Sequence, residues 1–168
     1  MGQIKDVVLD GPLHIRFKGI YDNEKVYNAI RGFIDEHGYD FLEPKYKEKA
    51  AGPTGNEGEI IIYCEKKITE YVMYSMDILI KFWNDRNFDA EVDGKTKKLS
   101  EGRIMIKIVA SIEFDYSGDV KGKFVEWLEV FLIRKLFQDY YITKYYVPLW
   151  IEAYDLQATV KTELGFSN

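Results

Sequence analysis

The sequence is poor in cysteine and histidine, and this excludes several kinds of stabilisation and chemistry. Cys64 is the only cysteine among 168 residues, so no intrachain disulfide can form, which is typical of a reducing compartment. The two histidines, His14 and His37, have no second imidazole or carboxylate nearby at ligand spacing. The sequence pattern indicates no catalytic Ser/His/Asp or Cys/His set. We therefore expect no metal, no cofactor and no nucleophilic catalysis.

Long apolar runs and net positive charge are also missing. The longest uncharged apolar stretch near the C-terminus, Tyr145–Ile151, falls far short of the ~20 residues that a membrane span needs. The N-terminal residues show no signal peptide. A net charge of −5 argues against nucleic acid as a general partner, because phosphate binding depends on a basic face. We expect a cytoplasmic protein without membrane insertion.

What the chain does contain is typical of a folded globular protein. Its 46% of hydrophobic and 30% of charged residues are enough for a core without disulfide or metal support. A chain of this length is most simply one domain, spanning residues 1–168, that buries roughly 70% of its unfolded surface.

The N-terminal part predicts a strand followed by a helix. Apolar and polar residues alternate over Leu13–Phe17, as in a half-buried strand. Asp22 or Asn23 is a suitable N-cap for the helix, and Gly38 is a suitable C-terminal stop. The apolar stripe of this helix consists of Val26, Ile30, Phe33, Ile34 and His37.

The middle of the chain predicts antiparallel strands with one apolar face. Alternation is regular over Ile60–Phe82 and clearest over Ile104–Tyr116, while lysines at alternate positions of Lys45–Lys49 are typical of an edge strand. Turn residues predict strand ends or loops at Gly19, Ala51–Gly58, Glu65–Ile68, Asn84–Asn87, Asp93–Gly94 and Ser100–Gly102.

The C-terminal quarter predicts a long helix that covers the sheet. Ten aromatic residues lie between Phe124 and Tyr154, and Val120–Val147 is apolar on more than one face, so both sides need a cover. Pro148 predicts a break and a restart of the helix. The helical segment within 148–168 either folds back over the uncovered face or extends onto another subunit, and both arrangements remain open.

The predicted fold class is therefore α+β, with a curved antiparallel sheet of about six or seven strands. The order of elements resembles the helix-grip arrangement of the START and polyketide-cyclase-like superfamily. The resemblance rests on layout alone, because no sequence motif matches a functional residue of that family to a residue of this chain. That resemblance implies a small hydrophobic or lipid-like ligand held between the sheet and the C-terminal helix. The predicted ligand-binding residues are Tyr74, Met76, Ile78, Ile108, Ile112, Phe114, Tyr116 and Phe131. The alternative is that such residues simply fill the core.

A rival hypothesis is a homodimer or another protein-interaction module that uses the aromatic C-terminal helices. Aromatic residues are enriched in interface cores, and the predicted interface residues are Phe137, Tyr141, Tyr145 and Trp150, with Tyr145 expected to be exposed. An enzyme is the third hypothesis, with Asp77, Tyr74 and Glu113 as its nominated residues.

Three further patterns are each outweighed by a simpler interpretation. The glycine-rich loop Ala51–Gly58 lacks the lysine and the helix of a phosphate-binding loop. Oxygen side chains over Asp115–Glu126 resemble a calcium loop, but Val120 replaces the glycine that the turn needs. Lysines that converge on one edge beside Tyr46 and Tyr63 suit single-stranded nucleic acid, or merely solubilise exposed hairpins. These lysines are Lys45, Lys47, Lys49, Lys66, Lys67, Lys95, Lys97 and Lys98.

Overall fold

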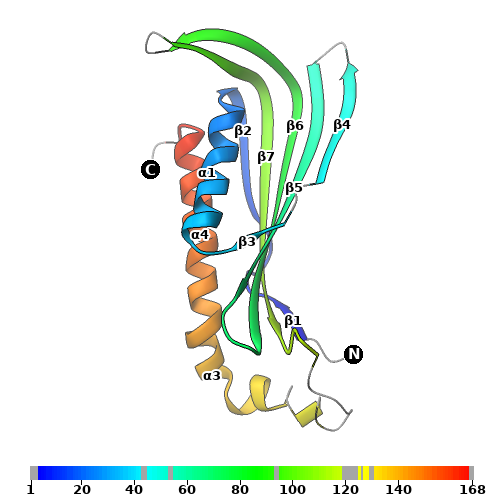
Figure 1. Ribbon diagram of the computed structural model, residues 1–168, viewed down its shortest axis with the longest axis vertical. Coiled ribbons are helices and arrows are strands. Elements are labelled where there is room, and N and C mark those ends of the chain that lie inside the picture. The colour runs from blue at the N-terminus through cyan, green and yellow to red at the C-terminus, as the bar shows by residue number, and fades with distance from the viewer. Residues whose placement is uncertain are drawn as a thin grey trace.

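The computed structural model describes residues 4–42, 45–52, 55–92, 95–118, 125, 127–128 and 131–166. Within these residues a curled antiparallel sheet of seven strands carries helices on one face, which confirms the predicted α+β class (Figure 1). The strands are β1 (Ile4–Val7), β2 (Leu13–Tyr21), β3 (Asp40–Phe41), β4 (Lys45–Gly52), β5 (Gly55–Lys67), β6 (Val72–Val92) and β7 (Lys95–Phe114). The helical elements are α1 (Asn23–Glu36), η1 (Leu132–Leu136), α3 (Gln138–Tyr141), η2 (Ile142–Tyr146) and α4 (Val147–Glu163), where η1 and η2 are π-helical turns.

Strand β7 is central to the sheet. It pairs with β6 on one side and with both β1 and β2 on the other, while β5 joins β6 to the short strands β3 and β4. Alternate residues of β6 and β7, such as Ile78 and Ile108, are fully buried on the inner face. Their neighbours, such as Lys81 and Lys107, lie on the outer face. The regular alternation in sequence therefore identified the buried face correctly.

Three predicted interruptions of the strands are wrong. Strand β2 continues through Gly19 to Tyr21, and β7 continues through Ser100–Gly102 without a turn. The residues Asn84–Asn87 form an irregularity within β6 instead of a turn, because the pairing with β7 shifts between Trp83 and Arg86. Pairing with neighbouring strands outweighs local turn preference here, and a β-bulge accommodates the extra residue.

Two other predicted loops are shorter or displaced. The Ala51–Gly58 segment is mostly strand, since β4 ends at Gly52 and β5 begins at Gly55. The turn expected at Glu65–Ile68 lies slightly later, because β5 continues to Lys67 before β6 begins at Val72. Asp93 and Gly94 lie outside the described residues, but Val92 and Lys95 on either side are paired.

Helix α1 forms as its sequence predicts. The Asp22 carboxylate accepts a hydrogen bond from the Lys25 backbone N–H at 2.9 Å, which is the N-cap interaction. Gly38 adopts a φ of 70°, a conformation that suits glycine after a helix C-terminus. The buried residues of α1 are Val26, Ile30, Phe33 and Ile34. The predicted stripe therefore faces the core.

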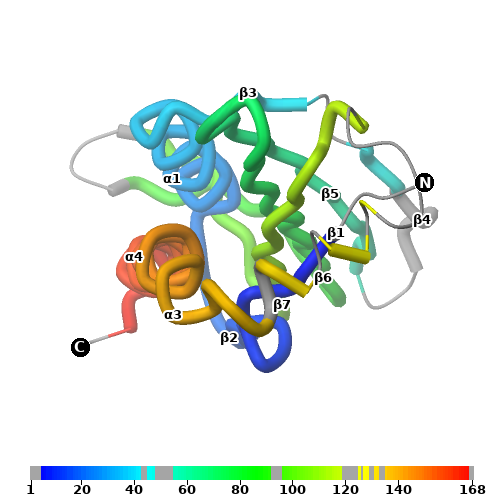
Figure 2. Tube along the Cα trace, turned by 90° about the horizontal axis from the view of Figure 1, so that it is seen from below, coloured from blue at the N-terminus to red at the C-terminus, as the bar shows by residue number. Residues whose placement is uncertain are grey.

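The C-terminal helix that covers the sheet runs from Gln138 to Glu163, across the predicted break at Pro148. Much of the first half of the predicted Val120–Val147 helix lies outside the described residues, and α4 contacts β7, β2 and α1. Its buried residues are Leu149, Ala153, Leu156 and Val160. Figure 2 shows α1 and α4 side by side over the same face of the sheet. The last segment therefore neither folds back over the preceding helix nor extends away, because it covers the sheet itself.

The predicted break at Pro148 takes the form of a widened helical turn. The chain stays helical from Gln138 to Glu163, but the Val147 N–H donates to the Ile142 carbonyl five residues back. Pro148 has no N–H to donate, and a π turn beside it adjusts the helix without ending it. None of the helices in the described part of the chain is both long and apolar enough to cross a membrane.

Candidate functional site

The first candidate site is the seam, which we define as the contact between the inner face of the sheet and the helical run Gln138–Glu163. Six predicted ligand-binding residues lie buried on β6 and β7 at this seam: Tyr74, Met76, Ile78, Ile108, Ile112 and Phe114. The rings of Tyr141, Tyr145 and Tyr146 surround Phe114, with centroid distances of 5.6, 6.5 and 6.3 Å. Side chains of the protein itself therefore occupy this end of the seam.

Two other predicted ligand-binding residues do not join these six. Tyr116 follows β7 in a turn, where the Lys67 Nζ lies 5.8 Å from the centroid of its ring. Phe131 is exposed and stacks on Trp127 with ring centroids 5.6 Å apart. The structure therefore divides the predicted ligand-binding set between the seam and two separate surface positions.

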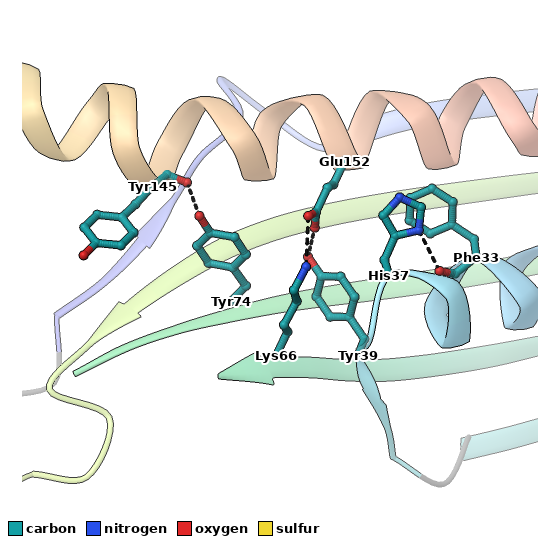
Figure 3. A network of polar contacts seen from close by, with 7 residues as sticks. All are labelled: Phe33, His37, Tyr39, Lys66, Tyr74, Tyr145 and Glu152. Carbon is teal, nitrogen blue, oxygen red and sulfur yellow. Dashed lines mark hydrogen bonds and ion pairs between the residues drawn. The ribbon is translucent and has the colours of Figure 1, made fainter. Parts of the chain in front are cut away.

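A polar network crosses the seam where α4 passes over the sheet (Figure 3). The Tyr39 hydroxyl donates to Glu152 Oε2 at 2.5 Å, and Lys66 Nζ lies 3.0 Å from Glu152 Oε1. Burial and the hydrogen bond to Glu152 both raise the pKa of Tyr39 far above its usual value. Tyr39 therefore remains a proton donor to Glu152, and the network ties α4 to the segment between α1 and β3.

Two other buried groups at the seam also keep their protons. The Tyr74 hydroxyl donates to the Tyr145 backbone carbonyl at 2.7 Å, and burial raises the pKa of Tyr74 to about 12. Burial likewise raises the pKa of the Cys64 thiol to about 12, and this thiol donates to the Met76 carbonyl at 3.4 Å. A thiol is a far weaker nucleophile than a thiolate, so Cys64 is suited to packing.

His37 has a structural role beside the same network (Figure 3). Its ring stacks on Phe33 at 3.8 Å, and its Nδ1 lies 3.0 Å from the Phe33 carbonyl. A carbonyl oxygen only accepts, so Nδ1 carries the proton in this hydrogen bond. Among the residues that the structure describes, no group of three or more His, Cys, Asp or Glu side chains could hold a metal ion.

The residues nominated for catalysis are not brought together. Tyr74 lies in the buried seam, whereas Asp77 and Glu113 belong to the opposite alternation of their strands. Asp77 pairs with Val109, and Glu113 pairs with Met73. These two pairs are four residues apart along the β6–β7 ladder. This geometry provides no shared site for acid–base chemistry.

The predicted lysine cluster does not assemble either. Lys45 and Lys47 lie on β4, and Lys66 faces Glu152 at the seam. Lys97 and Lys98 lie on the arm that residues 86–92 of β6 and 95–101 of β7 form beyond the bulge. Figure 1 shows β4 and the end of this arm at different sides of the sheet. The calcium-like loop falls largely outside the described residues.

The second candidate site is the outer strip, which we define as Val147, Trp150, Ile151 and Tyr154 on the exposed side of α4. Each of these side chains is between 40% and 47% exposed. Trp150 and Tyr154 also contact each other, with ring centroids 4.7 Å apart. The strip lies opposite the residues that α4 buries, so α4 is apolar on two faces.

The predicted interface residues only partly coincide with this strip. Trp150 belongs to it, and Phe137 is exposed nearby in sequence, while Tyr141 is half-buried against Phe114. Tyr145 is only 7% exposed, so the expectation that it lies on the surface is wrong. Tyr145 precedes the buried Leu149 by four residues, so helical spacing places both side chains on the face toward the sheet. Sequence reasoning missed Val147, Ile151 and Tyr154, although their spacing of four and three residues marks one helical face.

No protein-family model matches the chain, and no curated protein gives a significant match. The layout of an antiparallel sheet with a long C-terminal helix is compatible with a helix-grip fold. Function must therefore be inferred from the residues and their geometry.

Proposed function

We propose that this protein is a self-association module in which the outer strips of two copies pack against each other. The observation that carries the proposal is the second apolar face of α4. Trp150 and Ile151 at its centre are each 47% exposed, although α4 already buries a separate row of aliphatic residues. Tryptophan and tyrosine combine a large apolar surface with a polar tip, which suits protein interfaces.

The exposed apolar area on and just before α4 approaches what one partner of a standard interface buries. Phe137, Tyr140 and Ile142 precede the strip in sequence, and each of them is at least 37% exposed. Together with the strip they expose roughly 600 Å² of apolar surface, taking 150–250 Å² for each aromatic side chain. A standard interface buries about 800 Å² per partner, whereas patches on monomers seldom exceed a few hundred.

Charge complementarity supports a second copy in antiparallel orientation as the partner. Lys144 precedes Trp150 by six residues and Asp155 follows it by five, and both side chains are exposed. A twofold axis near Trp150 brings Lys144 of each copy close to Asp155 of the other. A parallel pair brings like charges together instead, which is unfavourable. The same axis places Val147 against Tyr154 across the interface.

Sedimentation velocity across a range of protein concentrations tests this proposal. We expect a concentration-dependent dimer for the unmodified chain and at least a tenfold weaker dimer for Ile151→Lys, because the new charge would be desolvated in the interface. The matched control is Ile20→Lys on β2, which makes the same chemical change at a side chain that is 56% exposed.

The two variants separate self-association from a general effect of added charge. We expect Ile20→Lys to dimerise like the unmodified chain, and circular dichroism checks that both variants are folded. A monomer at every concentration tested would overturn the proposal. Equal weakening by both substitutions would also overturn it.

A second candidate function is binding of a small hydrophobic ligand, as the helix-grip layout implies. It is supported by a hollow of about 630 Å³ between β1 and the helical segment before α4, beside the filled seam, and this volume is within the usual range for ligand pockets. Val7, Tyr141, Ile142 and Tyr146 contribute to its lining, and the Tyr146 hydroxyl donates to Asp6 at 2.7 Å. Native mass spectrometry of the purified protein distinguishes the candidates, because a co-purifying small molecule and subunit number both change the mass.

A further inference from the structure

The outer face of the sheet, opposite the helices, carries cations that lie side by side. Lys18 on β2 is directly paired with Arg103 on β7, and Arg16 is paired with Met105 two residues along the same ladder, on the same face of the sheet. Like charges in directly paired positions destabilise a sheet. Among the described residues, none of these three cations forms an ion pair or a side-chain hydrogen bond. No direct ion pair therefore offsets their repulsion, in a chain whose net charge is −5.

These cations line a pocket of about 640 Å³. The same pocket is bordered by Trp83 and Met105, which supply apolar surface, and by Glu57 and Asn84, which supply hydrogen-bonding groups. Trp83 is paired with Arg103, so its indole lies on the same outer face as the guanidinium. The volume is typical of a site for a small molecule.

A β-bulge in β6 shapes the rim of this pocket. Asn84 has a φ of 53°, in the left-handed region that non-glycine residues seldom adopt. The next residue, Asp85, turns inward, where it is 3% exposed and accepts hydrogen bonds from the Tyr21 hydroxyl at 2.8 Å and from Ser100 Oγ at 3.2 Å. This buried anchor holds the bulge in place and leaves Trp83 and Asn84 at the pocket. Bulges of this kind often re-aim side chains at functional sites.

Close backbone packing supports the same bulge from the opposite strand. Gly102 on β7 lies so near that an added Cβ would be 3.0 Å from the Asp85 Cα and from the Trp83 carbonyl oxygen. A larger residue there would require the backbone of the bulge to shift by a few tenths of an ångström. The pocket therefore lies on a rigid, specifically packed part of the sheet.

We propose that this pocket binds a mononucleotide or a closely similar phosphorylated aromatic molecule. Arg16, Lys18 and Arg103 would neutralise the phosphates, because guanidinium groups bind phosphate oxygens in bidentate fashion and lysine adds a point charge. The indole of Trp83 would stack against the base. Asn84 and Glu57 at the rim would donate to and accept from the polar groups of base or sugar. This activity is independent of the dimer, since the outer strip belongs to α4 on the other face of the sheet.

The test uses isothermal titration calorimetry of the full chain with ADP as the probe. We expect saturable binding that weakens as salt is added, because exposed charges are screened. We expect Arg103→Ala and Trp83→Ala each to weaken binding at least tenfold. The matched control is Lys107→Ala, also on the outer face of β7 but outside the pocket. It should change the affinity less than twofold, and thermal unfolding checks that every variant is folded.

Three results would overturn the proposal. One is failure of the unmodified chain to bind ADP at millimolar concentration, and another is unchanged binding by Arg103→Ala. The third is a single-stranded oligonucleotide that binds much more tightly than ADP, which would identify a polymer as the ligand. Pyrophosphate that binds as tightly as ADP, with no effect of Trp83→Ala, would refute the stacking role. Weaker binding of pyrophosphate than of ADP supports it.

Discussion

Helix α4 has two apolar faces that differ in the kind of side chain they carry. The face toward the sheet consists of Leu149, Ala153, Leu156 and Val160, all of them fully buried. The outer strip carries two aromatic residues, Trp150 and Tyr154, and remains about half exposed. Hydrophobicity alone therefore does not determine which face of a helix joins the core.

The difference lies in the size and the polar tips of the side chains. Ala153 at the middle of the buried face allows α4 to approach the sheet closely, and aliphatic neighbours fill the remaining space without unpaired polar atoms. Trp150 and Tyr154 each carry a polar group that would need a partner if it were buried within the monomer. An interface with a polar rim meets that need more easily than a core does.

The largest expected loss of stability comes from truncating a side chain on the buried face of α4. Leu156→Ala should lower the free energy of unfolding by about 2–5 kcal/mol, because it leaves a cavity where no water or side chain compensates. Ile151→Ala on the outer strip should change the free energy of unfolding of the monomer by no more than about 0.5 kcal/mol. Urea unfolding of dilute protein measures both. Similar losses from the two substitutions would show that the faces are not distinct.

A smaller loss of stability is expected from Glu152, which lies on α4 between its buried face and the outer strip. Glu152→Ala should cost about 1–3 kcal/mol, because the buried Tyr39 hydroxyl then loses its acceptor. Glu152→Gln keeps an acceptor for Tyr39 and loses only the charge that pairs with Lys66, so it should cost less. Urea unfolding compares the two variants. Equal costs would show that the ion pair, and not the hydrogen bond to Tyr39, holds α4 here.

A third expected effect concerns the free energy of unfolding at alkaline pH. Burial raises the pKa of Tyr74 to about 12 and also raises that of Tyr39, whereas tyrosine in an unfolded chain titrates near about 10. Above this pH the unfolded chain releases protons that the folded chain keeps. The free energy of unfolding should therefore fall as pH rises from about 10 toward 12.

Tyrosine variants identify the source of this pH dependence. Tyr74→Phe removes one titrating group from the buried face and should flatten the decline in the urea midpoint between about pH 10 and 12. Tyr154→Phe, on the outer strip, is the matched control from the other face. A decline that Tyr74→Phe leaves unchanged would contradict the assignment to the seam.

The sequence predicted those parts of the fold that local residues determine. Helix α1 was predicted to within a residue at its start, because the Asp22 cap and the Gly38 stop are local signals. The Asn84 bulge was interpreted as a turn, because only pairing between β6 and β7 distinguishes the two. A C-terminal helix on the sheet was also predicted, but the residues of it that contact the sheet were not, because both halves of the C-terminal region are apolar enough to cover a sheet.

The candidate sites were predicted less well, for a related reason. Lys18 and Arg103 are far apart in sequence, and each is an ordinary polar residue of an alternating strand. Only the register of β2 against β7 shows that they form a like-charge pair beside Trp83. For the outer strip the signal was present, since Val147, Trp150, Ile151 and Tyr154 have helical spacing. Without the position of the sheet, that spacing does not reveal which face is exposed.

The most direct measurement of the central claim, that two outer strips pair in antiparallel fashion, is cross-linking with a short bis-maleimide in a Cys64→Ala background. Ile151→Cys lies beside the proposed twofold axis and should give a covalent dimer in high yield. Ala158→Cys, exposed on the same helix, would lie roughly 24 Å along the axis from its symmetry mate, given a rise of 1.5 Å per residue, and should not react. Equal cross-linking at both positions would indicate a parallel pair, and none at Ile151→Cys would show that the outer strip is not a dimer interface.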